Sequence, residues 1–353
     1  MPNTQLTAAR NARHDEFYTQ IDDIAKELKH YKPYLKDKVI LCNCDDPYES
    51  NFFKVFALNF NAFGLKKLIA TCYDGSPITG NELSLDFGEF SSEPKKIAYK
   101  VEITEVKDYN GDGAVNLADV QYLIQNEKNV LSVLKGNGDF RSKECIELLK
   151  QADIVVTNPP FSLFREYVDQ LEKFEKQYVI VGNTNALAYK EIFRLFQQDK
   201  IRTGYTNFNV GMFFYVPDSY EKYHHMENGK KVARVSTSCW YTNLPVEKHK
   251  EEFVLYKKYN SAEYPKYEDH DAIDVSEAQL IPIDYYGIMG VPITFIDKFN
   301  PSQFEIVACC EPCIKLETLK KLPDFKEYPS RQKIYNGVLC QKKYHRLLIR
   351  RKQ

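Results

Sequence analysis

The segment ADIVVTNPPFSLF, residues 152–164, places an amide side chain, two prolines and an aromatic ring directly after an apolar run typical of a buried strand. Proline fixes φ and has no N–H, so the turn after Asn158 is stiff. Two oxygens, one on the Asn158 side chain and one on the Pro159 backbone, can then point outward beside Phe161. Such a corner suits an exocyclic amino group on a flat ring, because the oxygens accept its two N–H bonds and the phenyl group stacks on its face.

A simpler interpretation of these residues is the start of a helix. Pro160 then precedes the first turn, and Ser162 is the N-cap whose hydroxyl accepts a backbone N–H. Both interpretations can hold together, but capping alone does not explain why an asparagine precedes two prolines. The pattern therefore favours a binding corner for a planar amino group.

A second set of oxygen-bearing side chains lies in DYNGDGAVNLAD, residues 108–119, which resembles a calcium loop of the EF-hand or dockerin type. In chain order the expected ligands are Asp108, Asn110, Asp112, the carbonyl of Ala114, Asn116 and Asp119. The competing interpretation is a tight turn in which Asn116 caps the next helix and Asp119 supports its first turn. The aspartate side chain is short for the last ligand position, so the sequence leaves both the calcium loop and the tight turn open. A calcium ion at this loop would be structural. A non-catalytic, calcium-dependent interaction protein is then one functional alternative.

Bulk composition indicates the class of protein. The chain has 353 residues and a mass of 41.2 kDa, with 43% hydrophobic and 27% charged residues, as expected for one large and one smaller globular domain. No apolar run is long enough to cross a bilayer, and the first residues lack the apolar centre of a secretory signal. Nine cysteines, an odd number, indicate reduced thiols, so we expect a cytoplasmic protein without a membrane partner.

The first two thirds of the chain alternate strand-like and helix-like segments. Short apolar runs rich in branched residues predict strands at 38–43, 66–73, 129–138, 152–158 and 177–183. Helical patterns lie between several of them, at 50–60, 142–150 and 162–174. This alternation predicts an α/β fold with a parallel sheet covered on both faces, in which ligands bind beyond the carboxyl ends of the strands.

The pattern changes after residue 184. Asn228-Gly229 predicts a hairpin turn between two strands, and the alternation is lost from about residue 250. We therefore expect two domains, 1–250 and 251–353. Net charge is −1, but residues 331–353 hold eight lysines and arginines and no acidic residue, a concentration that would attract phosphates. A solvated basic tail is the alternative.

Asn-Pro-Pro-Phe after an apolar strand resembles the catalytic motif of amino-group methyltransferases that use S-adenosylmethionine, and further segments resemble the EcoRI-type family of adenine-N6 DNA methyltransferases. These segments are DEFYTQ (15–20), CNCDDP (42–47), SNFFK (50–54), GLKKLIA (64–70), GDFRS (138–142), DIVVTNPPFSLF (153–164), MGVPITF (289–295) and KFNPSQFE (298–305). They occur in the family's order and cover most of the chain outside residues 75–130. The resemblance implies a Rossmann-like methyltransferase sheet, an insertion at 76–130 and a C-terminal target-recognition region.

The resemblance also implies roles for individual residues. Asn158, Pro159, Pro160 and Phe161 would hold the target adenine. Residues that would contact the cofactor are Phe17, Tyr18 and Thr19 at its methionine end, Asn43, Asp45, Asp46 and Pro47 after the first strand, Asp139 and Phe140 at its adenine, and Asn158. Residues that would contact DNA phosphates are Arg331, Lys333, Lys342, Lys343, Arg346 and Arg350. For Asp45 and Asp46 helix capping is the alternative, and no Gly-rich turn follows the first strand.

The implied reaction is site-specific methylation of adenine N6 in duplex DNA. The methyl group of a sulfonium donor is already activated, so the protein mainly places the amino nitrogen, and no metal or strong base is required. The target base must leave the duplex, and Phe161 would stack on it. RNA adenine or protein-glutamine methylation is the close alternative, because both present a planar nitrogen to the same motif. The sequence leaves open whether a cognate restriction endonuclease acts on the same site and which oligomeric state the enzyme adopts.

Overall fold

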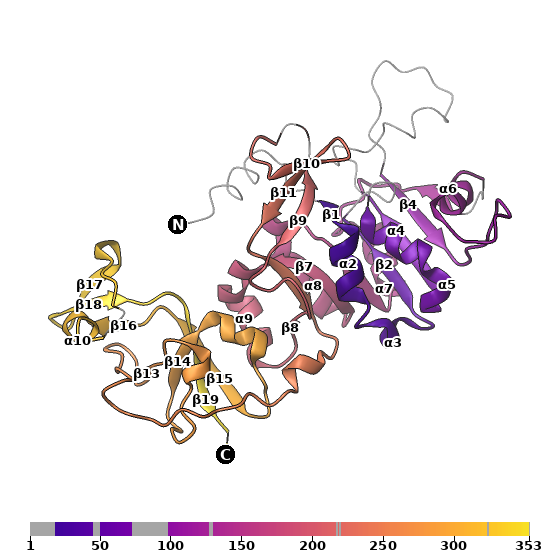
Figure 1. Cartoon of the computed structure of the whole chain (residues 1–353). Coiled ribbons are helices and arrows are strands. Elements are labelled where there is room, and N and C mark those ends of the chain that lie inside the picture. The colour runs from indigo at the N-terminus through magenta and orange to yellow at the C-terminus, as the bar shows by residue number, and fades with distance from the viewer. Residues whose placement is uncertain are drawn as a thin grey trace. The chain divides into compact units, whose positions relative to one another are not determined.

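The computed structural model describes residues 18–44, 50–72, 98–126, 130–216, 218, 220–322 and 325–352. The chain divides into two compact units. The first unit comprises Met1–Thr184 and Gly204–Leu244, and the second comprises Asn185–Thr203 and Pro245–Gln353. Figure 1 labels the helices and strands of both units.

A mixed α/β arrangement organises the first unit around a sheet with the strand order β5-β4-β3-β2-β6-β7-β12. In chain order these strands are β2 (Val39–Cys42), β3 (Lys67–Thr71), β4 (Tyr99–Ile103), β5 (Leu131–Val133), β6 (Ile154–Thr157), β7 (Gln177–Asn183) and β12 (Ser238–Thr242). The central strands β3, β2, β6 and β7 are parallel to one another. Strands β2 and β6 are buried along their whole length, as continuous apolar runs predict for the middle of a parallel sheet.

The flanks of this sheet are antiparallel, which differs from the parallel sheet predicted. Strand β4 runs antiparallel to β3, and β5 runs antiparallel to β4, so β4 is the reversed strand, whereas β5 has the direction of the central strands and is shorter than the strand expected at 129–138. Strand β12 runs antiparallel to β7 on the other side. The prediction was wrong here because Tyr99–Ile103, whose side chains alternate between buried and half-buried, lies in a segment treated as an insertion.

Helices lie before β2 and between the strands of the sheet in the first unit. They are α2 (Ile21–Leu28), α3 (Lys32–Leu35), α4 (Asn51–Leu58), α5 (Phe60–Phe63), α6 (Leu117–Asn126), α7 (Lys143–Gln151) and α8 (Phe164–Lys173). Helix α4 connects β2 to β3, and α8 connects β6 to β7 in the opposite direction along the sheet (Figure 1). Because such crossovers are right-handed, α4 and α8 cover opposite faces. No helix in the described part of the chain is long and apolar enough to span a membrane.

A smaller antiparallel sheet of the first unit joins its N-terminal strand to a hairpin. The order is β1-β9-β11-β10, with β1 (Tyr18–Thr19), β9 (Met212–Val216), β10 (His225–Glu227) and β11 (Lys230–Val235). Asn228 and Gly229 connect β10 to β11 with φ values of 49° and 78°. Positive φ at both positions is what a two-residue hairpin turn requires, so the predicted Asn-Gly turn is confirmed.

The second unit contains two small sheets and short helices. One sheet has the order β13 (Ile273–Asp274), β14 (Met289–Pro292), β19 (Arg346–Arg351) and β15 (Phe304–Cys310). The other has the order β16 (Cys313–Lys315), β18 (Val338–Lys342) and β17 (Gln332–Tyr335). The remaining elements are β8 (Arg202–Thr203), α9 (Lys190–Gln197), α10 (Leu316–Leu319) and 3₁₀ turns at Glu247–His249, Ala278–Leu280, Ile293–Lys298 and Pro329–Arg331. The basic C-terminal segment therefore forms strands of both sheets, so it is not a solvated tail.

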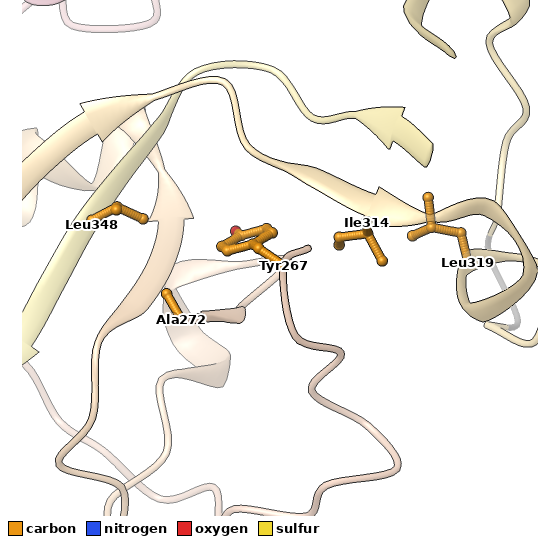
Figure 2. Close-up of a cluster of buried hydrophobic side chains, with 5 residues drawn as sticks. All are labelled: Tyr267, Ala272, Ile314, Leu319 and Leu348. Carbon is orange, nitrogen blue, oxygen red and sulfur yellow. The ribbon is translucent and has the colours of Figure 1, made fainter. Parts of the chain in front are cut away.

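Tyr267 lies in a buried hydrophobic cluster of the second unit. Figure 2 shows its ring between Leu348 and Ala272 on one side and Ile314 and Leu319 on the other. Leu322 and Phe325 pack against the same cluster from its partly buried edge. The cluster thus connects the sheet that contains β19 to the sheet that contains β16.

Gly290 in β14 makes room for the hydroxyl group of Tyr267. A Cβ atom at Gly290 would collide with the end of the Tyr267 ring. Without that atom, the Tyr267 hydroxyl donates a hydrogen bond to Oδ1 of Asp274 at 2.7 Å. The close approach explains on physical grounds why the MGVP segment carries a glycine at this position.

Candidate active site

Two asparagines follow neighbouring strands at the carboxyl edge of the central sheet. Strand β2 ends at Cys42 and is followed by Asn43, and β6 ends at Thr157 and is followed by Asn158. Because β2 and β6 pair in parallel, both asparagines lie at the edge where open α/β sheets bind ligands. The Thr157 hydroxyl donates to the backbone oxygen of Asn43 and joins the two strand ends.

Residues 158–161, which we call the Asn158 corner, turn sharply at this edge. Asn158 is 6% exposed and its Oδ1 atom is shielded from solvent, so the side-chain oxygen is not the outward-facing group that the sequence predicts. Pro159 is also buried, whereas Pro160 and Phe161 are half-buried. Pro160 has φ −54°, within the narrow range that its ring imposes. The prolines therefore hold a stiff corner whose aromatic ring remains partly accessible.

The helix after the corner begins later than the sequence predicts. A single 3₁₀ turn, η2 (Phe161–Leu163), follows Pro160, whose carbonyl accepts the Leu163 N–H at 2.9 Å. Helix α8 then begins at Phe164, and the residue before it makes no side-chain cap. Ser162 is exposed within the 3₁₀ turn, so its prediction as the N-cap was wrong. The Pro160 carbonyl therefore accepts a backbone N–H at the start of this segment, which is the role that the Ser162 hydroxyl was expected to have.

The Phe161 ring packs against the small antiparallel sheet. Its centroid lies 6.3 Å from that of Phe214 in β9, with the rings edge-on at 86°. Phe214 is paired with Thr19 of β1, and the backbone oxygen of Thr19 accepts the Asn51 amide at 2.8 Å. The structure therefore brings Tyr18 and Thr19 close to the Asn158 corner, although the two segments are far apart in the sequence.

The Thr19 hydroxyl is a candidate ligand contact. Thr19 is 1% exposed, and its Oγ1 atom has no hydrogen-bond partner among the described residues. Buried hydroxyls are nearly always hydrogen-bonded, and an unsatisfied one costs about 1–3 kcal/mol. A polar ligand bound at this edge would remove that cost. The residues present therefore fit a small molecule with hydrogen-bonding groups.

Tyr167 connects the turn at Phe140 to the end of β2. It projects from α8 into the core, and its hydroxyl donates to Oδ1 of Asn43. Its ring meets that of Phe140 edge-on, with the centroids 5.0 Å apart. Burial raises the pKa of the Tyr167 hydroxyl well above its ordinary value, so this group remains a donor. Asn43 and Phe140, which were predicted from separate motifs, therefore both contact Tyr167.

Asp139 is held in place by Arg141. Its carboxylate accepts two hydrogen bonds from the guanidinium, at 2.9 Å and 2.7 Å, and a third from the Arg141 backbone N–H at 2.8 Å. These bonds, with those from the guanidinium strongest, lower the pKa of Asp139. The side chain is 27% exposed, so the ionised carboxylate keeps acceptor capacity for a ligand.

Four predicted cofactor residues, Phe17, Asp45, Asp46 and Pro47, lie outside the described residues. The structure nevertheless bears on the alternative interpretation of the two aspartates. Helix α4 begins at Asn51, and Ser50 caps it by accepting the Phe53 N–H. Capping of this helix therefore does not require Asp45 or Asp46.

The six basic residues predicted to contact DNA all have carboxylate partners. Glu311 pairs with Arg331 and Lys342 at 3.4 Å each, Asp269 with Lys333 at 3.0 Å, Asp274 with Lys343 at 3.0 Å and Arg346 at 3.2 Å, and Glu305 with Arg350 at 3.6 Å. The carboxylates belong to residues 269–311, which the charge count over 331–353 does not include. The local excess of positive charge is therefore smaller than the sequence of that segment predicts.

Side-chain exposure separates these basic residues into two groups. Arg350 and Lys342 are 47% and 40% exposed, and their ion pairs are solvent-screened. The side chain of Arg346 is only 11% exposed. The exposed residues are available to a phosphate at the surface, whereas Arg346 is reached only from within the fold.

The loop at 108–119 closes on itself through Asp119. One oxygen of Asp119 accepts the N–H groups of Tyr109 and Asn110 at 2.8 Å and 3.2 Å, and the other accepts that of Asn116 at 2.8 Å. These bonds, with that from Asn116 strongest, lower the pKa of Asp119. Asp119 thus supports the first turn of α6. This is the arrangement expected if residues 108–119 form a tight turn and not a calcium loop.

The other acidic side chains of this loop also bond within it. Asp108 accepts the N–H groups of Gly111 at 2.6 Å and Gly113 at 2.7 Å, and Asp112 accepts that of Ala114 at 2.9 Å. No group of three or more His, Cys, Asp or Glu side chains that could hold a metal ion occurs in the described ranges. The structure therefore lends no support to a calcium ion at this loop.

Two residues of the site, Tyr167 and Phe214, were not predicted from the sequence. Tyr167 follows Phe164 by three positions and precedes Leu171 by four, so the helical pattern marks it only as a core residue. Phe214 is one of several aromatic residues in β9. The alternation of that strand indicates burial, but nothing local indicates contact with Phe161.

Comparisons with known proteins agree with this arrangement. The family model described as adenine-specific methyltransferase EcoRI matches residues 5–352. The Type II methyltransferase M.EcoRI of Escherichia coli is 44% identical over 311 residues, which cover 86% of this chain and 89% of that protein. M.MpnI of Mycoplasma pneumoniae and M.MgeORF184P of Mycoplasma genitalium are each 35% identical and cover 98% of this chain and 97% and 98% of their own lengths.

No solved structure matches the chain. The family match nevertheless covers both units, and each motif at the edge of the sheet lies within it. With the Asn158 corner placed beside the ends of β2 and β6, the chain belongs to the EcoRI family of adenine-specific methyltransferases.

Proposed function

We propose that this enzyme transfers a methyl group from S-adenosylmethionine to N6 of an adenine at a specific site in duplex DNA. Membership in a family of adenine-specific methyltransferases implies this donor, and the relatives are named Type II methyltransferases. The observation that supports the proposal most is the convergence of Asn43, Thr19 and the Asn158 corner at one sheet edge. The chain passes from β2 to β3 on one side of the sheet and from β6 to β7 on the other side. The boundary between β2 and β6 is therefore the topological switch point expected of a Rossmann-like methyltransferase.

The Asn158 corner holds the adenine amino group in this proposal. The Asn158 side-chain oxygen and the Pro159 backbone oxygen accept its two N–H bonds, which favours a pyramidal nitrogen whose lone pair is no longer delocalised into the ring. S-Adenosylmethionine supplies an activated methyl group, and the protein contributes the alignment of the nitrogen with it. The buried, proline-braced position of Asn158 supports this role, because a preorganised acceptor loses little energy to reorganisation.

Phe161 holds the adenine outside the duplex in this proposal. Rotating a base out of DNA costs on the order of a few kcal/mol. Stacking on one aromatic side chain returns about 1–3 kcal/mol, which is of the same size. The half-buried state of the Phe161 ring supports this role, since part of the ring remains accessible.

In this proposal, residues of β1, of the end of β2 and of the turn at 139–140 would hold the cofactor. The Thr19 hydroxyl and the Asp139 carboxylate bond its polar groups, while Tyr18, Asn43 and Phe140 line its sides. The unpartnered Thr19 hydroxyl among the described residues supports this assignment. Phe17, Asp45, Asp46 and Pro47 belong to the same proposed set.

The second unit recognises the DNA target in this proposal. Lys342 and Arg350 are the most exposed of the predicted basic residues and contact phosphates, as do Arg331 and Lys333. Phosphate contacts set orientation, and base contacts in the groove set the sequence that is methylated. Binding that is driven by phosphates must weaken steeply as salt rises.

One experiment tests the function. The protein is incubated with labelled S-adenosylmethionine and, in parallel, with plasmid DNA, RNA or a protein extract, and modified adenines in the plasmid are mapped by single-molecule sequencing. We expect label in duplex DNA, confined to N6 of adenine within one short sequence that then resists a restriction endonuclease of the same specificity. Label in RNA or in protein glutamine, with none in DNA, would overturn the proposal in favour of those alternatives.

Calcium binding at residues 108–119 stays a prediction, because aspartate carboxylates that bond backbone N–H groups can exchange them for an ion. Calorimetric titration of the full chain with calcium checks it, with Asp108→Asn and Asp112→Asn as a matched double variant. Binding predicts heat and a raised melting temperature in the wild type only. The absence of both would leave the loop as a turn that caps α6.

A further inference from the structure

The second unit contains a pocket of about 570 Å³ that lies entirely within residues 257–346. Its volume falls in the range of sites that enclose small ligands. We call it the Arg346 pocket. It is separate from the Asn158 corner, which belongs to the first unit.

Charge in the wall of the Arg346 pocket favours an anion. Six lysines and arginines line it, against two acidic residues. One acidic residue, Asp274, is 4% exposed and pairs with both Lys343 at 3.0 Å and Arg346 at 3.2 Å. Two cations therefore face one carboxylate, which leaves one positive charge at this wall without compensation.

Arg346 has donor capacity left inside the fold. The residue is 9% exposed, and its Nε atom, although 3.2 Å from Oδ1 of Asp274, has no partner with hydrogen-bond geometry among the described residues. A guanidinium has five N–H donors in a rigid fork and cannot lose its charge, so buried arginines usually bind carboxylate or phosphate oxygens through several of them. The neighbouring carboxylate of Asp274 also accepts the Tyr267 hydroxyl, so it holds Arg346 in place without satisfying the fork.

Aromatic side chains form another part of the wall. Tyr264, Phe325, Tyr328 and Tyr344 all line the pocket. Tyr344 is 64% exposed and meets Tyr328 edge-on, with ring centroids 6.4 Å apart. The Arg331 guanidinium lies 4.1 Å from the centroid of the Tyr344 ring and steadies it. Lys326 lines the same pocket and has no carboxylate partner among the described residues.

From these features we infer that the Arg346 pocket seats a nucleotide of the DNA substrate, with a phosphate at Arg346 and Lys343 and the base against the tyrosines. The inference rests on the proposed function, since it assumes that DNA is the substrate. An anion without a flat ring would leave the aromatic wall unused, and an apolar ligand would leave Lys326 and the remaining donors of Arg346 without a partner. A nucleotide satisfies both parts of the wall, because base–aromatic stacking and phosphate pairing act on the same molecule.

The first test measures DNA affinity against salt for Lys343→Gln and Lys326→Gln in the full chain. Lys315→Gln is the matched control, since Lys315 is an exposed lysine with a carboxylate partner that does not line the pocket. A lost phosphate contact lowers the slope of log Kd against log salt by about 1. We expect that change in both pocket variants and no change in the control. Melting temperatures identify any variant that fails to fold.

The second test locates the base. DNA that carries 5-iododeoxyuridine at each position of the site in turn is irradiated with the full-length enzyme, and cross-linked peptides are identified by mass spectrometry. We expect one position to cross-link to Tyr328 or Tyr344. Tyr344→Phe should keep the DNA affinity, whereas Tyr344→Ala should weaken it about tenfold, as loss of one stacking contact does.

Two outcomes would overturn the inference. Wild-type methylation of DNA with unchanged salt slopes in both pocket variants would show that DNA does not enter the pocket, although the proposed function stands. Binding of free dAMP that the pocket variants abolish, with DNA affinity unaffected, would assign the pocket to a free nucleotide instead. Failure of the wild type to methylate DNA is a separate result, which contradicts the proposed function itself.

Discussion

Phe161 can be changed with little effect on the fold around it. Its ring is half-buried and meets Phe214 edge-on, whereas the next aromatic residue, Phe164, is 2% exposed and packs under β7. A substitution at Phe161 therefore removes ring surface at the edge of the sheet without opening the core. The consequence for function depends on whether that surface holds the target base.

We predict that Phe161→Ala lowers kcat/KM for DNA methylation about tenfold to a hundredfold, because one stacking contact of about 1–3 kcal/mol is lost. The affinity for S-adenosylmethionine, measured by equilibrium dialysis, should stay near that of the wild type. Phe161→Trp is the control and should retain activity, since indole also stacks. Equal losses of methylation and cofactor affinity would contradict this division of roles.

At the scale of elements, the position of the Asn158 corner depends on how α8 lies on the sheet. Gly182 in β7 lies beneath the first residue of α8. A Cβ atom at Gly182 would approach the Phe164 ring to 2.6 Å and the Tyr241 ring to 2.8 Å, both closer than such atoms come in proteins. Tyr241 belongs to the neighbouring strand β12, so the glycine lets strand and helix pack closely.

We predict that Gly182→Ala displaces the start of α8 and lowers kcat more than it raises KM, because the corner that precedes α8 shifts with it. Overpacking of this kind also costs about 1–3 kcal/mol of stability. Gly136→Ala is the matched control, since a Cβ there meets nothing within 4 Å. Steady-state kinetics and thermal unfolding check both variants, and equal behaviour of the two would refute the packing argument.

At the scale of the whole molecule, stability should depend on pH through a buried histidine in the second unit. His249 is 5% exposed, and its ring nitrogens lie 3.0 Å from the Phe299 carbonyl oxygen and 3.2 Å from that of Thr203. Burial lowers the pKa of His249 below its ordinary value of 6.5, and the nearby Lys248 ammonium acts in the same direction. The folded state therefore holds this ring neutral.

Because the pKa is lower in the folded state, the unfolded chain binds the proton more readily. The stabilising contribution of neutral His249 is present above about pH 6.5 and is lost as the pH falls through the folded-state pKa. We predict that the free energy of unfolding, measured with urea, falls between pH 7.5 and pH 5.5 by a larger amount in the wild type than in His249→Gln. Parallel pH profiles of the two proteins would contradict the prediction.

Much of this molecule was predictable from local patterns. The strands at Val39–Cys42, Lys67–Thr71 and Ile154–Thr157 lie within their predicted ranges, because buried parallel strands are continuous apolar runs. The Asn228-Gly229 turn was equally clear, since few dipeptides adopt two positive φ values. The antiparallel β4 was missed because two of its five residues are only half-buried and its partner is distant in sequence.

The sequence by itself determined a stiff corner, because a proline-braced Asn158 after a buried strand is a property local to four residues, and it predicts there an acceptor for an amino group. Only the tertiary structure decided which distant groups meet that corner. Thr19 reaches it through the pairing of β1 with β9, and Tyr167 reaches Asn43 from α8. Likewise, the apparent excess of positive charge in the basic segment after residue 330 became smaller once Asp269, Asp274 and Glu311 came beside it. Contacts between distant segments arise from sheet order and packing, which no short stretch of sequence encodes.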